Sequence, residues 1–301
     1  VVYLAEQDQP KRLVALKVLA ANLLGSQEAI DRFTRECQVL SRLDCPHVAR
    51  IFSAGQTNGI PYLVMQYVPG ETLARFLEDG PPPPNVTLHL IRQVAEGLDH
   101  AHRQGILHRD IKPGNIIIRG DQGSNLRATI VDFGLARIEG GATLTGAGQV
   151  LGTPRYMSPE QIHGSRSGPE APSDIYSLGA TLFEMLTGKP WIKAETHKEI
   201  IAQITAGTAQ RSATFPPEIP ANLQAVCRKM LAPDPSHRYR SARELIDEIG
   251  RLEEGRRVHA SRPRRRTLTL GLASIVLVAV ILARPSGLLP DRESPDREIP
   301  V

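Results

Sequence analysis

Cysteine is scarce in this 301-residue sequence, which contains only Cys37, Cys45 and Cys227. The three are scattered along the chain, and no two of them stand at a CxxC spacing. An odd set without that spacing argues against a disulfide framework and against a zinc site. We therefore expect a reducing compartment, and we interpret each cysteine as a small apolar core residue.

Aromatic residues and unbalanced charge are also largely missing. Trp, Tyr and Phe together make up 4% of the chain. The basic pI of about 9.1 comes from residues 251–266, which hold seven arginines and two glutamates and leave the rest with 29 basic and 30 acidic residues. A nucleic-acid-binding protein would show a basic surface with interleaved aromatic residues, so the sequence argues against that class.

Long uncharged hydrophobic runs are limited to residues 267–283, between Arg266 and Arg284. As a helix this run would span roughly 26 Å, slightly less than the ~30 Å hydrocarbon core of a bilayer. The flanking arginines can extend their reach to the headgroups. Because the run has no polar face, it predicts a single transmembrane helix in preference to the alternative, a buried core helix.

The basic residues beside this run predict its orientation. Residues 254–266 are expected to form a basic juxtamembrane linker, and arginines next to a spanning helix favour the cytoplasmic side. Residues 284–301 are polar and rich in proline, which predicts a short disordered tail outside the cell. The sequence therefore predicts a single-pass protein of the cell membrane whose main body is cytoplasmic.

Hydrophobic periodicity divides that body into a strand-rich part and a helical part. Short apolar runs at residues 1–5 and 13–19 predict a hairpin, and two further strands are expected at 48–54 and 62–68. Apolar residues recur at helical spacing over 26–43, with Ser26 as a plausible N-cap. Further helices are expected at residues 88–104, 173–186, 222–231 and 242–252.

Two motifs carry the chemistry of this body. Residues 108–115 read His-Arg-Asp-Ile-Lys-Pro-Gly-Asn, and Asp132-Phe133-Gly134 follows 22 residues after Asp110. Together they supply a carboxylate that can accept a proton, an ammonium group, and two oxygen donors for a metal. Phosphoryl transfer requires mainly positioning and charge compensation, and these residue types provide both.

This order of motifs resembles the eukaryotic-type serine/threonine protein kinases, and with the membrane segment it is similar to the bacterial receptor-like members. The resemblance covers about residues 1–250. It implies an α+β, bilobal kinase fold with a small β-rich N-lobe at 1–68 and a larger helical C-lobe at 69–253. Residues 66–70 would connect the lobes, and the transmembrane helix would follow.

The resemblance also implies roles for the motif residues. Asp110 would be the base for a Ser or Thr hydroxyl of a protein substrate, and Lys112 would neutralise charge near the γ-phosphate of ATP. Asn115 and Asp132 would bind Mg²⁺, with Mn²⁺ as an alternative ion. Both side chains offer the hard oxygen donors that Mg²⁺ prefers.

The nucleotide site implied by the resemblance begins in the N-lobe. Lys17 would contact the α- and β-phosphates of ATP and pair with Glu36, which lies at the edge of the apolar face of its helix. The adenine ring would occupy an apolar slot and bond the connecting backbone. The residues expected around adenine are Val2, Ala15, Met65, Gln66, Val68 and Ile117.

A third motif, Gly152 to Glu160, resembles the end of a kinase activation segment. By resemblance, Glu160 would pair with Arg238, Asp174 would brace the catalytic loop, and Phe133 would pack on His108 between the lobes before Gly134. Arg109 precedes the base and would bind a phosphate on this segment, which implies autophosphorylation. The candidate positions are Thr143, Thr145 and Thr153.

The glycine-rich loop of this family is missing from the sequence as given. Only Val1 and Val2 match the end of that motif, so we expect a glycine-rich segment upstream. Without it, an alternative remains open: a pseudokinase or membrane scaffold that binds partners without turnover. Self-association into a homodimer also stays open.

Overall fold

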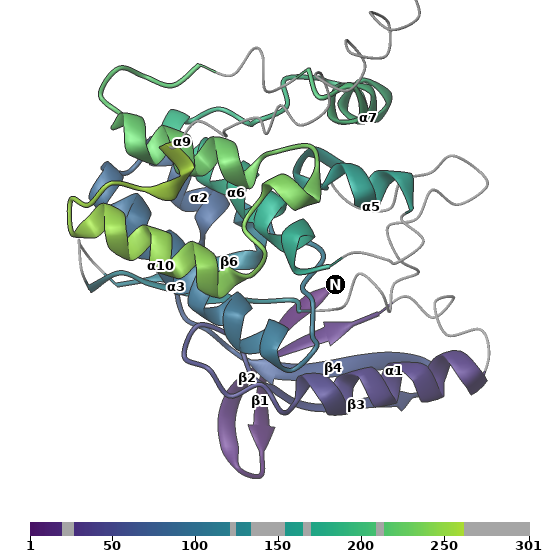
Figure 1. Cartoon of the computed structure of the whole chain (residues 1–301). Coiled ribbons are helices and arrows are strands. Elements are labelled where there is room, and N and C mark those ends of the chain that lie inside the picture. Colours follow the sequence, from purple (N-terminus) through teal and green to yellow (C-terminus); the bar gives the residue numbers. More distant parts are fainter. Residues whose placement is uncertain (20–26, 121–124, 134–153, 165–169, 209–213, 262–301) are drawn as a thin grey trace, which may run out of the picture. The chain divides into compact units, whose positions relative to one another are not determined.

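The fold is known from a computed structural model. The residues described are 1–19, 27–120, 125–133, 154–164, 170–208 and 214–261. These residues belong to one compact unit, Val1–Ser261. Within that unit, a sheet-containing N-terminal part is followed by a helical part (Figure 1). This is the predicted order of a β-rich lobe and a helical lobe.

The N-terminal lobe is built on a four-stranded antiparallel sheet in the order β1-β2-β4-β3. Its strands are β1 (Val2–Asp8), β2 (Lys11–Val18), β3 (Ile51–Thr57) and β4 (Ile60–Gln66). The hairpin predicted from the first two apolar runs is confirmed. The other two strands exist, but β3 ends later and β4 begins earlier than predicted.

A tight turn at Asn58 and Gly59 explains this difference in strand limits. Both residues have positive φ angles, 49° and 76°. An Asn-Gly pair with two positive φ angles matches the twist of a two-residue hairpin, so the strands continue up to the turn on both sides. The loop predicted at residues 55–61 was therefore too long, because this dipeptide alone makes the turn.

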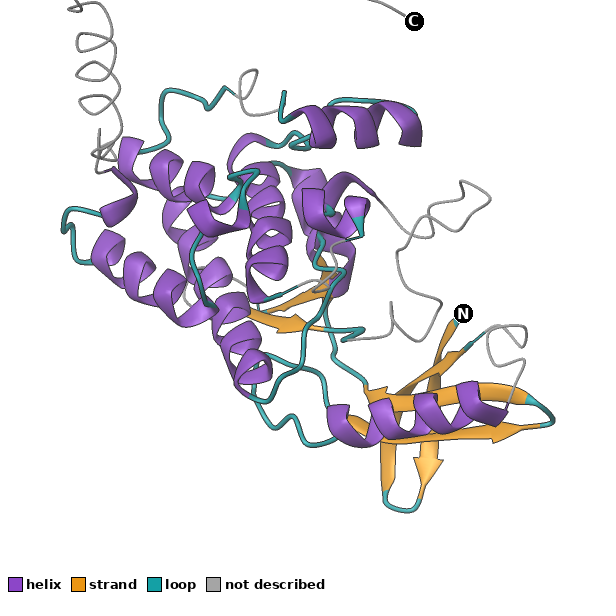
Figure 2. Ribbon diagram, turned by 45° about the vertical axis from the view of Figure 1, so that its right-hand side comes forward, coloured by secondary structure: helices purple, strands orange, loops and turns teal. Residues whose placement is uncertain are grey.

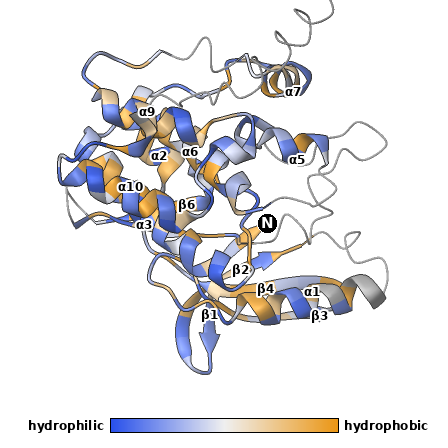
Figure 3. Cartoon of the chain, viewed as in Figure 1, coloured by the Kyte–Doolittle hydropathy of each residue, from blue (hydrophilic) through white to orange (hydrophobic). Residues whose placement is uncertain are grey.

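Helix α1 (Gln27–Leu40) packs against one face of this sheet, as Figure 2 shows. Phe33, Cys37 and Leu40 recur at helical spacing, and all three are buried. The ribbon of α1 accordingly carries both hydrophilic and hydrophobic residues (Figure 3). The predicted helix is confirmed with shorter limits, and Ser26, its expected N-cap, lies outside the described residues.

The C-terminal lobe is mainly helical, and each helix predicted there is present within a few residues of its predicted limits. A second, three-stranded sheet in the order β5-β6-β7 was not predicted. The strands are β5 (Glu71–Thr72), β6 (Ile116–Arg119) and β7 (Arg127–Ile130). The helices are α2 (Leu73–Phe76), α3 (Pro84–Arg103), α5 (Pro159–His163), α6 (Ala171–Thr187), α7 (His197–Ala206), α9 (Ala221–Met230) and α10 (Ala242–Glu253).

Helix α6 is the centre of the helical lobe. Thirteen of its residues, from Ser173 to Leu186, are buried. It contacts α3 and α9, and Gly179 permits the close approach to α9, because a Cβ there would lie 2.8 Å from Cβ of Met230. A helix buried on this scale is a rigid support for the loops attached to it.

The folded unit extends beyond the predicted end of the helical lobe. A linker was expected from residue 254, but the chain remains packed through Ser261. Val258 is fully buried, and the Ala260 N–H donates to Oε1 of Glu248 at 2.8 Å. One buried valine was too weak a signal to place this short segment in the core.

The membrane prediction concerns residues outside the described part. Among the described residues, no helix has both the length and the apolar composition that a bilayer span requires. Residues 262–301, which include the predicted spanning run at 267–283, are not described.

Gly179→Ala should destabilise the protein by about 1–3 kcal/mol, because the added methyl group forces α6 and α9 apart. Gly250→Ala is the matched control, since a Cβ in that part of α10 meets only the far end of Arg92 at 3.9 Å. Loss of backbone entropy in the unfolded state should make the control more stable by about 0.5–1 kcal/mol. Urea unfolding measures both, and equal shifts in the same direction would contradict the packing described.

Candidate active site

The catalytic-loop motif lies between α3 and β6 and is held by Asp174 of α6. Oδ2 of Asp174 accepts the His108 N–H at 2.9 Å, and Oδ1 accepts the Arg109 N–H at 2.7 Å. Asp174 is 1% exposed, so these bonds compete with little water. The predicted bracing of the loop by Asp174 is present.

A histidine with no recognisable motif of its own completes the environment of Asp174. His102 of α3 lies with Nε2 2.9 Å from Oδ2 of Asp174. Burial by itself would raise the pKa of Asp174, but the hydrogen bonds from His102 and from the His108 N–H lower the pKa overall. Asp174 is therefore held as a carboxylate, the form that can accept all of these donors.

Two residues of the candidate site adopt a left-handed backbone conformation. Arg109 has φ 68° and Asp132 has φ 63°. This region costs a residue with a Cβ roughly 1–2 kcal/mol. The bonds that Asp174 makes to the loop help to offset that cost, which ties the geometry of the site to the buried core.

The proposed base, Asp110, lies beside Lys112 and Asn115. Its Oδ2 accepts from Nζ of Lys112 at 2.7 Å and from Nδ2 of Asn115 at 2.9 Å. Asn115 also donates to the Asp110 carbonyl at 2.8 Å. The structure thus brings the three polar side chains of the catalytic loop together.

Asp132 reaches the same region through the pairing of β6 with β7. The Val131 N–H donates to the Asn115 carbonyl at 2.9 Å, so the residue before Asp132 is bonded directly to Asn115. On its other side, Asp132 accepts from Nζ of Lys17 at 3.2 Å. The carboxylate therefore lies between the sheet lobe and the catalytic loop.

The side-chain oxygens of Asn115 and Asp132 fit a magnesium ion whose other ligands are phosphate groups. Both bonds from the Asn115 side chain use Nδ2, and no described residue donates to its Oδ1. Asp132 adds a carboxylate. The described residues contain no cluster of three or more His, Cys, Asp or Glu side chains suited to a metal. Mg²⁺ often takes only one or two protein oxygens and completes its shell with phosphates and water.

Phe133 packs on the catalytic loop as predicted. Its ring makes an edge contact with His108, with the ring centroids 4.6 Å apart. Nε2 of His108 also lies 3.0 Å from the Val131 carbonyl. His108 therefore joins the segment before Asp132 to the catalytic loop, which supports a structural role for this imidazole.

Three of the residues expected around adenine, Val2, Ala15 and Met65, share one face of the N-terminal sheet. Val2 pairs with Lys17 and Ala15 pairs with Met65. Directly opposed residues share a face, and alternate residues of one strand do so as well. Lys17 and the apolar side chains thus face the same side of the sheet, as a nucleotide site requires.

The backbone bonds from Gln66 and Val68 to adenine stay a prediction. The Gln66 N–H already donates to the Arg50 carbonyl at 2.8 Å. No hydrogen bond joins the Val68 backbone to a described residue. Ile117 lies on β6, in the second sheet.

The remaining site predictions fall into three groups. The pairing of Lys17 with Glu36 stays a prediction. Gly134, Thr143, Thr145 and Thr153 lie outside the described residues. The roles given to the other residues also stay predictions, although the structure places their side chains as described.

Glu160 and Arg238 form the predicted ion pair. Nη1 and Nη2 of Arg238 donate to the two carboxylate oxygens at 2.6 and 2.9 Å, a bidentate geometry. The Arg238 side chain is fully buried. Burial by itself would raise the pKa of Glu160, but the bonds and charge of Arg238 and a bond from Ser173 lower it.

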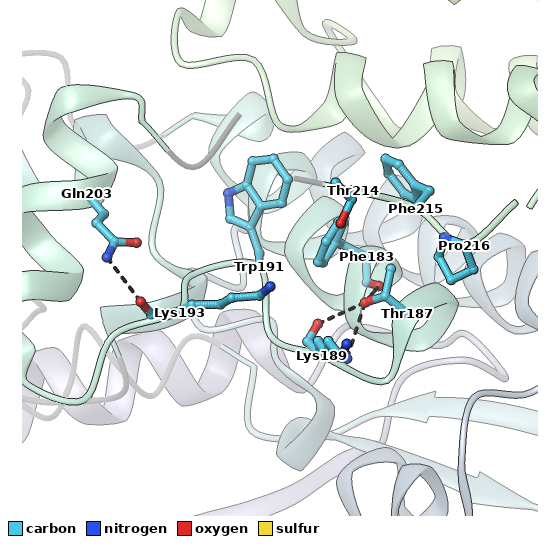
Figure 4. A pocket seen from close by; sticks show the side chains of 9 residues that line it. All are labelled: Phe183, Thr187, Lys189, Trp191, Lys193, Gln203, Thr214, Phe215 and Pro216. Carbon is cyan, nitrogen blue, oxygen red and sulfur yellow. Dashed lines mark hydrogen bonds between the residues drawn. The ribbon is translucent and has the colours of Figure 1, made fainter. Parts of the chain in front are cut away.

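A separate cavity of about 250 Å³ lies elsewhere in the helical lobe (Figure 4). Phe183 lines it, with its ring centroid 5.0 Å from that of Trp191 and 5.2 Å from that of Phe215. Lys189 and Lys193 also line it. It contains none of the residues predicted for phosphoryl transfer.

Glu160→Gln should lower the free energy of unfolding by about 3–5 kcal/mol at neutral pH, because it leaves a buried guanidinium without its carboxylate. The folded-state pKa of Glu160 lies below its ordinary value of 4.5. Its stabilising effect is therefore complete above that value and is lost as the pH falls through the folded pKa.

Urea unfolding of both proteins between pH 7 and pH 4 checks this prediction. The stability difference between wild type and variant should narrow at the acid end. A stability difference that stays constant across the range would show that the pKa of Glu160 is the same in the folded and unfolded states, which would contradict the prediction.

Comparison with known proteins agrees with this site. The family model described as "Protein kinase domain" matches residues 1–248. Serine/threonine-protein kinase PrkC of Bacillus subtilis is 37% identical over 249 residues, which are 82% of this chain and 38% of PrkC. Serine/threonine-protein kinase PknB of Mycobacterium leprae is 35% identical over 265 residues, 84% of this chain and 41% of PknB.

A solved structure has a similar fold. The crystal structure of the Mycobacterium tuberculosis PknI kinase domain superposes with a TM-score of 0.62 at 27% identity and covers 83% of this chain and 89% of that chain. The chain spans about two fifths of the length of the curated relatives it matches. Together with the bilobal arrangement of sheet and helices, the family match shows that the chain belongs to the protein kinase family.

Proposed function

We propose that the protein is a serine/threonine protein kinase that transfers the γ-phosphoryl group of ATP to a hydroxyl of a protein substrate. The observation that carries this proposal is the set Asp110, Lys112 and Asn115, which share hydrogen bonds beside Asp132. The relatives named serine/threonine-protein kinases support the same activity.

The reaction follows from where these groups lie. Asp110 accepts the proton of the substrate hydroxyl while that oxygen forms a bond to the γ-phosphorus. The bond from the γ-phosphorus to the bridging oxygen breaks, and ADP leaves with the electron pair. Lys112 is 2.7 Å from Asp110, close enough to compensate charge on the group in transfer.

Lys17, Asn115 and Asp132 would hold the nucleotide. The Lys17 ammonium lies next to the Asp132 carboxylate, so it can contact phosphates that approach the same position. Asn115 and Asp132 would bind Mg²⁺, which when bound neutralises phosphate charge and orients the triphosphate. The Asp-Ile-Lys-Pro form of the catalytic loop favours Ser and Thr substrates over Tyr.

Membrane attachment is a further part of the proposal. The uncharged run at 267–283 would span the cell membrane once, with the kinase domain in the cytoplasm. The arginines at 262–266 support this orientation. Phosphate on Thr143, Thr145 or Thr153 would act as a ligand for Arg109, so autophosphorylation would regulate the enzyme.

Asp110→Asn should lower kcat by roughly 10²–10⁴-fold, because asparagine keeps the shape of the side chain but cannot accept the proton. ATP affinity should change little. The measurement is transfer of ³²P from ATP to a protein substrate, with wild type and variant assayed side by side. Activity within about threefold of wild type would contradict the assigned role.

Deletion of residues 267–283 should move the protein from the membrane fraction to the supernatant, because the deleted run is the proposed anchor. Deletion of the equally long tail 285–301 is the control and should leave the protein in the membrane fraction. The prediction is wrong if non-aggregated protein without 267–283 still sediments with membranes.

A further inference from the structure

Gln161, at the start of α5, is bonded directly to the catalytic loop. Its Nε2 donates to the Arg109 carbonyl oxygen at 2.9 Å. Gln161 is 8% exposed, so little water competes for this bond. The two residues are 52 positions apart in the chain, and the contact therefore depends on the tertiary fold.

This bond acts on the peptide group that leads into the proposed base. The oxygen of that peptide, from Arg109, accepts from Gln161, and its N–H, from Asp110, donates to Nδ1 of His108 at 3.2 Å. The peptide is thus bonded at both ends. Rotation of this peptide would move Cα and Cβ of Asp110. The two bonds therefore limit where the Asp110 carboxylate can lie.

Asp174 and Gln161 hold different parts of the loop. Asp174 binds the N–H groups of His108 and Arg109, which precede this peptide. Gln161 binds the carbonyl that follows them. Arg109 has φ 68°, a conformation that a residue with a Cβ adopts only when its surroundings hold it there.

The amide of Gln161 is itself oriented. Its Oε1 accepts from the N–H of Ser158 at 2.9 Å and lies 3.1 Å from Oγ of Ser158. With the oxygen fixed in this way, the NH₂ group points toward Arg109. Ser158 and Gln161 stand at the end of the motif that resembles an activation segment, next to Glu160 and its ion pair with Arg238.

We propose that Gln161 is a positioning residue for phosphoryl transfer: it fixes the Arg109–Asp110 peptide and thereby couples the end of the activation segment to the base. The inference rests on the proposed kinase activity. It adds a residue that the catalytic motifs do not contain.

A simpler reading gives Gln161 only a local role. It occupies the third position of α5, and together with Ser158 it forms a capping box. In that motif the side chain at the third position stabilises the helix start. Both roles predict lower stability when Gln161 is replaced. A useful variant therefore keeps the oxygen that accepts from Ser158 and loses the N–H group that donates to Arg109.

Gln161→Glu separates the two roles. Glutamate is isosteric, and it is a standard residue at the third position of a capping box, so it keeps the acceptor for Ser158. It has no N–H to donate to Arg109. Gln161→Met is the matched second variant, since it is of similar size and lacks both donor and acceptor.

The positioning role predicts that both variants lower kcat about tenfold or more, while KM for ATP stays within about twofold. Both variants should lose thermal stability, because each removes the buried bond to the Arg109 carbonyl, so kcat is compared at a temperature at which wild type and both variants are fully folded. A Glu variant with kcat within about twofold of wild type under these conditions would overturn the inference.

Amide hydrogen exchange provides a readout that needs no turnover. The peptide covering residues 106–112 should exchange faster in the Glu variant, because the loop has lost one of its bonds. Unchanged exchange there would overturn the inference. If the wild-type protein transfers no phosphate, the proposed function fails, and exchange still decides whether Gln161 holds the loop.

Discussion

The buried carboxylate of Asp174 joins the catalytic loop to the core of the helical lobe. It lies on α6, the most deeply buried helix described, and accepts two backbone N–H groups of the catalytic loop and a bond from His102. A charge in this position is stable only with several donors. The buried carboxylate therefore needs the N–H groups of the loop as partners, and the loop needs the carboxylate to keep its conformation.

This dependence explains how a strained backbone can be maintained at the active site. Arg109 and Asp132 both have positive φ angles. Residues with a Cβ rarely keep this conformation unless their surroundings hold them in it. Asp174, His108 and Gln161 supply the bonds that keep the strained segments in place. The polar side chains then project toward one region, where charge can be compensated without rearrangement during the reaction.

The sequence predicted the parts of the site that consist of short motifs and the parts of the fold that have clear periodicity. Asp110, Asn115 and Asp132 were identifiable because their spacing is fixed by one loop and one strand pair. His102 and Gln161 were not, because a histidine at the end of a helix and a glutamine at the third helical position have common local roles. The strand limits at Asn58 and Gly59 were missed although the turn signal was present. The short strands β5, β6 and β7 were missed because two to four residues carry too little periodicity.

A structure of the protein with Mg²⁺ and a non-hydrolysable ATP analogue would show whether Asn115 and Asp132 hold the metal beside Asp110. We expect Oδ1 of Asn115 and the carboxylate of Asp132 both to bind the metal at about 2.0–2.1 Å, with the γ-phosphate directed toward Asp110. A bound nucleotide whose metal contacts neither residue, or whose γ-phosphate points away from Asp110, would contradict this expectation.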